Sequence, residues 1–135
     1  GALALIDCDR FKSINDTYGH MVGDQVLIAL AEAIAKCIHK GDIALRLGGD
    51  EFAIYMINIV DKENAKVHIQ HVFDRVNKIH IPQIYDHPIH ISMGVTFFHP
   101  ETPMEFDRLY QQADKALYES KRTVGTIATF YEDVK

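Results

Sequence analysis

The stretch that decides the fold runs from Ile43 to Ile57 and reads IALRLGGDEFAIYMI. Apolar runs at residues 43–47 and 52–57 flank the four residues Gly48-Gly49-Asp50-Glu51. Two apolar runs around a short turn that contains glycine are typical of a β-hairpin, because glycine supplies the positive φ angles of tight turns. The stretch therefore predicts two antiparallel strands with two acidic residues at their tip.

Outward from this hairpin, short apolar runs alternate with segments of helical periodicity. We expect a strand at residues 2–6 that ends at Asp7, turns at 15–16 and 18–20, and a helix from Gly23 to Gly41. The later elements that we expect are a helix over 65–76, strands at 89–91 and 95–98, a helix over 106–117 and a strand at 129–131. Strands joined by a hairpin and by helical connections predict an α+β fold, with a mixed central β-sheet flanked by helices.

The composition is that of an ordinary globular domain. The chain has 135 residues, 14 Lys+Arg against 19 Asp+Glu, and a net charge of −5. This length predicts one domain, and the 47% hydrophobic residues exclude disorder, collagen and coiled coil. The net negative charge argues against a nucleic-acid binder, which usually carries a basic face. For the same reason, a polyphosphate ligand would need a local cluster of lysines or a metal ion. Cys8 and Cys37 match no zinc motif and predict reduced thiols in a cytosolic protein.

Acidic residues stand at two places where expected strands end. Asp7 follows the first strand, and the turn after it, with Lys12, could cradle phosphates. Asp50 and Glu51 at the hairpin tip would repel each other unless a cation neutralises them. Each place has a plain alternative. Asp7 and Asp9 could be helix caps with Lys12 a surface charge, and the hairpin tip could be a solvated turn.

If the two strands are neighbours, the carboxylates of Asp7 and Asp50 meet. Mg²⁺ prefers a few hard oxygen ligands together with substrate phosphates, and paired carboxylates that hold such ions serve in-line attack on nucleoside triphosphates. These residues, without any comparison, therefore predict an enzyme that catalyses metal-dependent phosphotransfer or nucleotidyl transfer. Asn15 and Asp24 flank a turn and could read a guanine edge, because a carboxylate accepts two hydrogen bonds at once. Their alternative is a role as turn and cap residues.

Three spaced motifs resemble the GGDEF domain of diguanylate cyclases. They read Asp7-x-Asp9-x-Phe11-Lys12-x-x-Asn15-Asp16-x-x-Gly19-His20-x-x-Gly23-Asp24-x-x-Leu27, then Arg46-x-Gly48-Gly49-Asp50-Glu51-Phe52, then Ala113-Asp114-x-Ala116-Leu117-Tyr118-x-x-Lys121. The motifs occur in the family's order over nearly the whole chain, which makes the resemblance far more specific than a lone short motif.

The resemblance implies a single GGDEF-type catalytic domain over residues 1–135, with a fold similar to the palm domain of adenylyl cyclases and polymerases. Such domains are diguanylate cyclases, which condense two GTP molecules into cyclic di-GMP and release two pyrophosphates. Each subunit binds one GTP, so the implied active unit is a homodimer with its two sites face to face. The implied cofactor is Mg²⁺, with Mn²⁺ as a substitute.

The resemblance also implies a role for each matching residue. The metal ligands are the carboxylates of Asp7 and Asp50 with the backbone carbonyl of Cys8, and Glu51 is a second catalytic or metal-facing acid. Either Asp50 or Glu51 assists deprotonation of the ribose 3′-OH. The implied substrate contacts are guanine recognition by Asn15 and Asp24, and phosphate binding by Lys12, Lys121 and the backbone amides of Arg10, Phe11 and Lys12.

The chain departs from the family pattern at three places. The family's late helix is usually followed by Gly-Arg-Asn, whereas this chain has Val124-Gly125-Thr126. The Arg-x-x-Asp of the product-inhibition site is here His39-Lys40-Gly41-Asp42, which predicts weak or absent product inhibition. The family's leading Asp-x-Leu-Thr-Gly-Leu-x-Asn-Arg segment and any sensor domain are absent from this chain.

These departures leave two further readings open. The main alternative is a catalytically weak GGDEF domain that binds GTP and regulates an attached domain, such as a cyclic di-GMP phosphodiesterase. A more distant alternative is an interaction module with a vestigial site. For partners we expect GTP, a second copy and attached sensor or effector domains, with no nucleic acid and no membrane contact by this domain. The expected location is cytoplasmic, within a protein that can itself be membrane-anchored.

Overall fold

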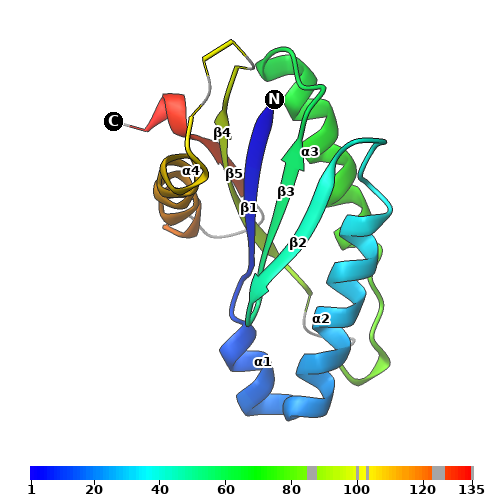
Figure 1. The fold of residues 1–135 in the computed structure, drawn as a ribbon. Coiled ribbons are helices and arrows are strands. Elements are labelled where there is room, and N and C mark those ends of the chain that lie inside the picture. The colour runs from blue at the N-terminus through cyan, green and yellow to red at the C-terminus, as the bar shows by residue number, and fades with distance from the viewer. Residues whose placement is uncertain (85–87, 100, 103, 123–126, 135) are drawn as a thin grey trace.

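A five-stranded mixed sheet forms the centre of the fold (Figure 1). The computed structural model describes residues 1–84, 88–99, 101–102, 104–122 and 127–134. The strands are β1 (Ala2–Cys8), β2 (Ile43–Gly48), β3 (Glu51–Met56), β4 (Ile91–Phe97) and β5 (Ile127–Phe130), in the order β2-β3-β1-β4-β5. β4 and β5 pair in parallel and the other neighbours pair antiparallel. The predicted α+β fold with a mixed sheet is confirmed.

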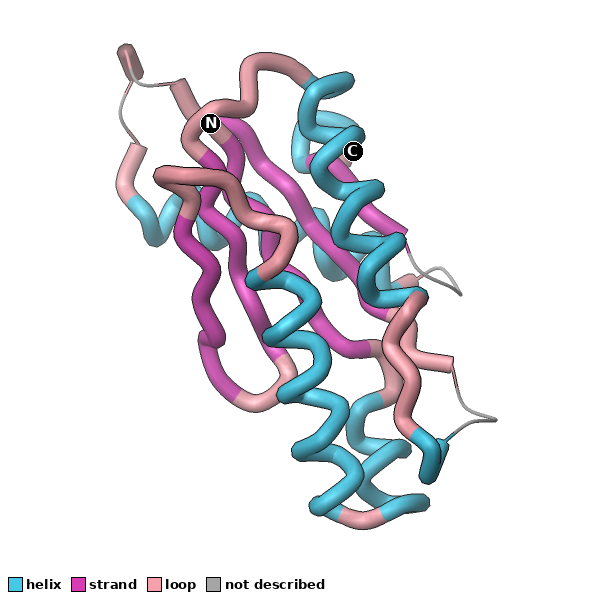
Figure 2. The backbone as a smooth tube through the Cα atoms, turned by 90° about the vertical axis from the view of Figure 1, so that its right-hand side faces the viewer, coloured by secondary structure: helices cyan, strands magenta, loops and turns pink. Residues whose placement is uncertain are grey.

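Helices cover both faces of this sheet. The helices are α1 (Phe11–Tyr18), α2 (His20–Ala35), α3 (Lys62–Asn77) and α4 (Phe106–Lys121), with short 3-10 turns η1 (Pro82–Ile84) and η2 (Tyr131–Asp133). Figure 2 looks onto the face that α2 and α3 cover, and Figure 1 shows α4 on the opposite face. Among the described residues, no helix combines the length and the apolar character that crossing a membrane requires.

The central strand β1 is buried on both sides because its side chains alternate between two cores. Ala2, Ala4 and Ile6 belong to the larger core, which α2 and α3 complete. Leu3 and Leu5 belong to a smaller core under α4. Successive side chains of a strand point to opposite faces, so the next residue of the second set, Asp7, is directed to the α4 side.

The boundaries of the first two helices differ from the sequence-based expectation. Residues 15–16 were expected in a turn, but they lie inside α1, where Ile14 is fully buried. α2 begins at His20 rather than Gly23, because Gly19 with its φ of 94° separates it from α1. α2 also ends at Ala35 rather than at Gly41, which lies in the turn before β2.

In place of the expected strands at 89–91 and 95–98 there is one strand, β4, which begins at Ile91, ends at Phe97 and pairs with β1 through residues 92–94 as well. Ser92 and Gly94 interrupt the apolar pattern, yet Ser92 is fully buried and its hydroxyl donates to Asp9 at 2.6 Å. The last strand also differs, because β5 spans Ile127–Phe130 and Tyr131 already belongs to η2.

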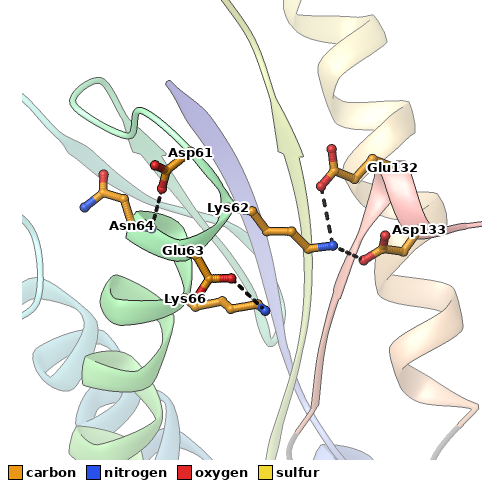
Figure 3. Close-up of polar contacts among 7 residues, drawn as sticks. All are labelled: Asp61, Lys62, Glu63, Asn64, Lys66, Glu132 and Asp133. Atoms are coloured by element: carbon orange, nitrogen blue, oxygen red, sulfur yellow. Dashed lines mark hydrogen bonds and ion pairs between the residues drawn. The ribbon is translucent and has the colours of Figure 1, made fainter.

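The end of the described chain is tied to the start of α3 (Figure 3). Lys62 donates to Asp133 at 2.6 Å and lies 3.5 Å from Glu132, and its ammonium sits over the Phe130 ring. Asp61 caps the same helix end by accepting the N–H of Asn64 at 2.7 Å. These contacts are at the opposite end of β1 from Asp7, so they stabilise the fold without lining the acidic site.

Candidate active site

Three carboxyl groups meet where β1 ends beside the β2–β3 hairpin. Asp7 of β1 and Glu51 of β3 are direct cross-strand partners. Glu51 alternates with Ala53, which packs under α4, so both acids are directed to the α4 side of the sheet. Asp50 lies in the hairpin turn, and its carbonyl accepts the Cys8 N–H at 3.4 Å. The hairpin tip is therefore held against the end of β1.

The charge balance of this cluster is incomplete. Asp7 is only 8% exposed, and its Oδ2 accepts a hydrogen bond from the Lys121 ammonium at the end of α4. The other oxygen, Asp7 Oδ1, is buried and has no hydrogen-bond partner among the described residues. A buried carboxylate oxygen without a partner is costly, since it gives up water and gains nothing in return.

The pKa of the Asp50 carboxyl reflects its burial and also the excess of negative charge in this cluster. Its partial burial, and then the neighbouring Asp7 carboxyl, raise the pKa of Asp50 to about 6, although Lys121 acts in the opposite direction. The pKa of Lys121 is itself raised: burial opposes the charge, but the bond to Asp7 and the surrounding carboxylates outweigh that effect. One ammonium thus serves several carboxyl groups and does not satisfy them all.

A divalent cation fits this donor set. It would supply the partner that Asp7 Oδ1 does not find among the residues that the structure describes, and it would relieve the repulsion between Asp7 and Asp50. Among the described residues, no group of three or more His, Cys, Asp or Glu side chains is arranged to hold a metal ion. A cation here would therefore need backbone, water or substrate oxygens as well, which is how Mg²⁺ is usually bound.

The Cys8 thiol does not belong to this donor set. Its side chain lies in the core on the other face of the sheet, and it is 3% exposed. Burial, and then the negative charges of Asp50, Asp9 and Asp7, raise the pKa of the Cys8 thiol to about 12. Only the backbone carbonyl of Cys8 is suited to the ligand role that the family resemblance implies.

Helix α1 begins just beyond the end of β1 (Figure 1), three residues after Cys8. Arg10 precedes the helix in the left-handed conformation, with φ 57° and ψ 31°, and it turns the chain sharply from β1 into α1. Phe11 packs against the larger core, whereas Lys12 is exposed. The N–H groups of the first helical turn have no partners within the helix, so they are available to an anion.

Asn15 and Asp24 come from the two helices of the α1–α2 hairpin. Asn15 is half-buried, and its side-chain oxygen lies against Gly23 so closely that a Cβ at Gly23 would overlap it. Asp24 is the next residue on α2 and is exposed. The structure thus brings the two expected base-reading residues to one place, and the absence of a side chain at Gly23 makes room for Asn15.

Sequence reasoning missed Tyr110 of α4. Its hydroxyl donates a hydrogen bond to Glu51 Oε1 at 2.8 Å, and this bond, with partial burial second, raises the pKa of Tyr110 to about 12. The helical spacing of Phe106, Leu109, Tyr110 and Ala113 places Tyr110 on the apolar face of the expected helix. No local pattern shows that its hydroxyl reaches a strand 59 residues away in the chain.

Of the three departures from the family pattern, one lies outside the described residues and one lies in a turn that the structure describes. Residues 124–126, where the family has Gly-Arg-Asn, lie outside the described residues. The Asp42 carboxylate accepts the backbone N–H groups of His39 and Ile57, each at 3.1 Å. At this place Asp42 therefore organises the turn between α2 and β2.

Residues 1–126 match the family model described as diguanylate cyclase, GGDEF domain. The chain belongs to the GGDEF domain family. The GGDEF domain is 38% identical over 120 residues to diguanylate cyclase DgcM of Escherichia coli K12, covering 89% of this chain and 28% of that protein. The chain spans about a quarter of the length of the curated relatives it matches, from 22% to 32%.

Solved GGDEF structures share the fold. The active GGEEF domain of a diguanylate cyclase from Vibrio cholerae matches with a TM-score of 0.84 at 30% identity, over 98% of this chain and 83% of that one. The GGDEF domain of DgcB from Caulobacter crescentus, solved in complex with c-di-GMP, matches with a TM-score of 0.82 at 28% identity, over 98% of this chain and 78% of that one.

Proposed function

We propose that this GGDEF domain condenses two GTP molecules into cyclic di-GMP with release of two pyrophosphates. The observation that carries the proposal is the convergence of Asp7, Asp50 and Glu51 at one end of the sheet, where a buried Asp7 oxygen has no hydrogen-bond partner within the described part of the chain. Such a cluster is unfavourable in an empty protein and favourable with a cation and a polyphosphate bound.

In this proposal Asp7, Asp50 and the Cys8 carbonyl hold the cation, which is Mg²⁺ or in its place Mn²⁺. When bound, the cation lowers the pKa of the ribose 3′-OH and neutralises charge on the leaving pyrophosphate. Asp50 or Glu51 accepts the proton of that hydroxyl. The support from this chain is the placement of both acids: Glu51 faces Asp7 across the two strands, and Asp50 lies in the adjoining hairpin turn.

The same proposal assigns the substrate contacts. Asn15 and Asp24 read guanine, while Lys12 and the amides of Arg10, Phe11 and Lys12 hold phosphates. Lys121 pairs with Asp7 in the absence of ligands. With a cation held by Asp7, the Lys121 ammonium would be free to contact a phosphate oxygen instead.

Joining two GTP molecules requires two copies of a site that binds one GTP, so we propose that catalysis takes place in a homodimer. We further propose that the full-length protein carries sensor or effector domains. We propose a cytoplasmic location, because free cysteines such as Cys8 and Cys37 are typical of a reducing compartment. We also propose that product inhibition is weak, because His39 stands where the family has arginine.

Product analysis by mass spectrometry tests the proposed activity. Concentrated protein is incubated with GTP and Mg²⁺, in parallel with Asp50→Ala and with Asp74→Ala, which removes an exposed acid on α3. We expect cyclic di-GMP from the wild type and Asp74→Ala but not from Asp50→Ala. Bound GTP without product, also after fusion to a dimerising coiled coil, would contradict the proposal.

A further inference from the structure

Helix α4 forms the second wall of the acidic site. Two of its side chains reach the two cross-strand acids: Lys121 contacts Asp7, and Tyr110 contacts Glu51. Like charges directly opposite each other on neighbouring strands are destabilising. α4 therefore supplies a hydrogen-bond donor for each of the two acids that the sheet places side by side.

The Tyr110 ring is held on the sheet independently of its hydroxyl. It packs against the small core under α4, which includes Leu5, Ala53 and Ala113, and it tilts against the Phe106 ring at 6.4 Å between centroids. A ring fixed by packing presents its hydroxyl in one direction, and that direction is toward Glu51 Oε1 at 2.8 Å. Fixing Oε1 also fixes where the other carboxylate oxygen points.

The two donors differ in charge, and the difference matters for a cation site. The Lys121 ammonium neutralises Asp7, so it competes with a cation for that carboxylate. A tyrosine hydroxyl is neutral, so it orients Glu51 without compensating its charge. The Glu51 carboxylate thus keeps its full attraction for a cation while its rotamer freedom is reduced.

We propose that Tyr110 is a positioning residue that aims the Glu51 carboxylate at the cation and nucleotide site. The proposal rests on the proposed function for the identity of the ligands. What is new is the role of Tyr110: α4 orients Glu51 through this residue, independently of the contact that Lys121 makes with Asp7.

The test compares Tyr110→Phe with Tyr118→Phe. The first keeps the ring and its packing and removes only the hydroxyl; the second makes the same change on the same helix, where the residue is 64% exposed. Mn²⁺ affinity is measured by electron paramagnetic resonance with a GTP analogue that carries a methylene bridge between the α and β phosphorus atoms. Tyr110→Phe should weaken Mn²⁺ binding by about three- to tenfold, whereas Tyr118→Phe should stay within about twofold of the wild type.

A second arm shows whether the effect passes through Glu51. In a Glu51→Ala background, Tyr110→Phe should cause no further loss of Mn²⁺ affinity, because the acid that it positions is gone. In turnover assays, Tyr110→Phe should lower kcat by about three- to tenfold and leave KM for GTP within about twofold.

Two results would overturn the positioning role: Mn²⁺ affinity in Tyr110→Phe equal to that of Tyr118→Phe, or an equal loss with and without Glu51. If the wild type makes no cyclic dinucleotide but the Mn²⁺ measurements behave as expected, the positioning role stands and the proposed cyclase activity fails. The binding arm therefore separates the two proposals.

Discussion

Gly94 of β4 lies directly against the backbone carbonyl of Ala113 in α4. A Cβ at Gly94 would overlap that carbonyl oxygen and also the Leu117 backbone nitrogen. Glycine at this position thus sets how closely α4 approaches the sheet. Because α4 carries Tyr110 and Lys121 to the acidic site, this approach also sets the reach of both side chains.

Adding a methyl group at Gly94 should push α4 away from the sheet. We expect Gly94→Ala to lower the free energy of unfolding by about 1–3 kcal/mol, as overpacking of a core does, and Gly94→Val to lower it further. Urea unfolding followed by circular dichroism measures the change as a shift in midpoint. An unchanged midpoint for both variants would show that α4 is not in close contact at this position.

Gly23 should control GTP binding through Asn15. The atom that a new Cβ would meet is the end of the Asn15 side chain, which can move aside, so we expect Gly23→Ala to cost little stability. The displaced amide should weaken GTP binding by about tenfold, in line with the loss of one base contact. Isothermal titration with GTP checks this, and Gly23→Ala added to Asn15→Ala should have no further effect. Additive losses would refute a route through Asn15.

The left-handed conformation of Arg10 should store strain. Its φ of 57° is unfavourable for a residue with a Cβ, and asparagine tolerates this region better. Arg10→Asn should therefore raise the free energy of unfolding by about 0.5–1 kcal/mol, and Arg10→Val should lower it by about 1–2 kcal/mol. Lys12→Asn, within α1, is the control and should bring no gain. The prediction fails if Arg10→Asn and Arg10→Val shift the urea midpoint alike.

The raised pKa of Asp50 predicts how stability depends on pH without a cation. A folded-state pKa of about 6, above the ordinary 3.8, means that the folded protein binds the proton more tightly than the unfolded chain. This stabilisation is complete below pH 3.8 and disappears as the pH rises through 6. In EDTA, Asp50→Asn should be more stable than wild type at pH 7.5, and the gap should close toward pH 4. Thermal melts across this range test the trend, and a gap independent of pH would contradict it.

The two cysteines should differ in reactivity. Burial and three neighbouring aspartates raise the pKa of Cys8 to about 12. Cys37 is less buried, and although burial raises its pKa, Arg75 partly offsets this. At pH 8 a thiol reagent should modify Cys37 first and Cys8 at least about a hundredfold more slowly. Mass spectrometry of the wild type and Cys37→Ser distinguishes the sites, and rapid labelling of Cys37→Ser would contradict the prediction.

Although α1 was not predicted, the hairpin, the helices α2, α3 and α4, and the family could all be predicted from the sequence alone. These follow from local causes: apolar periodicity distinguishes strands from helices, and glycines between apolar runs mark the turn at residues 48–49. The same reasoning placed Asp7, Asp50 and Glu51 at strand ends. It erred where long-range packing decides, as in the division of β4 at Gly94, because a glycine that weakens a strand pattern in sequence here makes room for a helix.

Which side chains share the site depends on how distant elements pack together. Strand alternation directs Asp7 and Glu51 to one face, but the packing of α4 on that face is what brings Tyr110 and Lys121 to them. A hydrogen bond between residues 51 and 110 depends on how two elements far apart in the chain pack together, and no local periodicity encodes that geometry. The chain pattern thus specifies the acids, and the packing of one helix against the sheet specifies their partners.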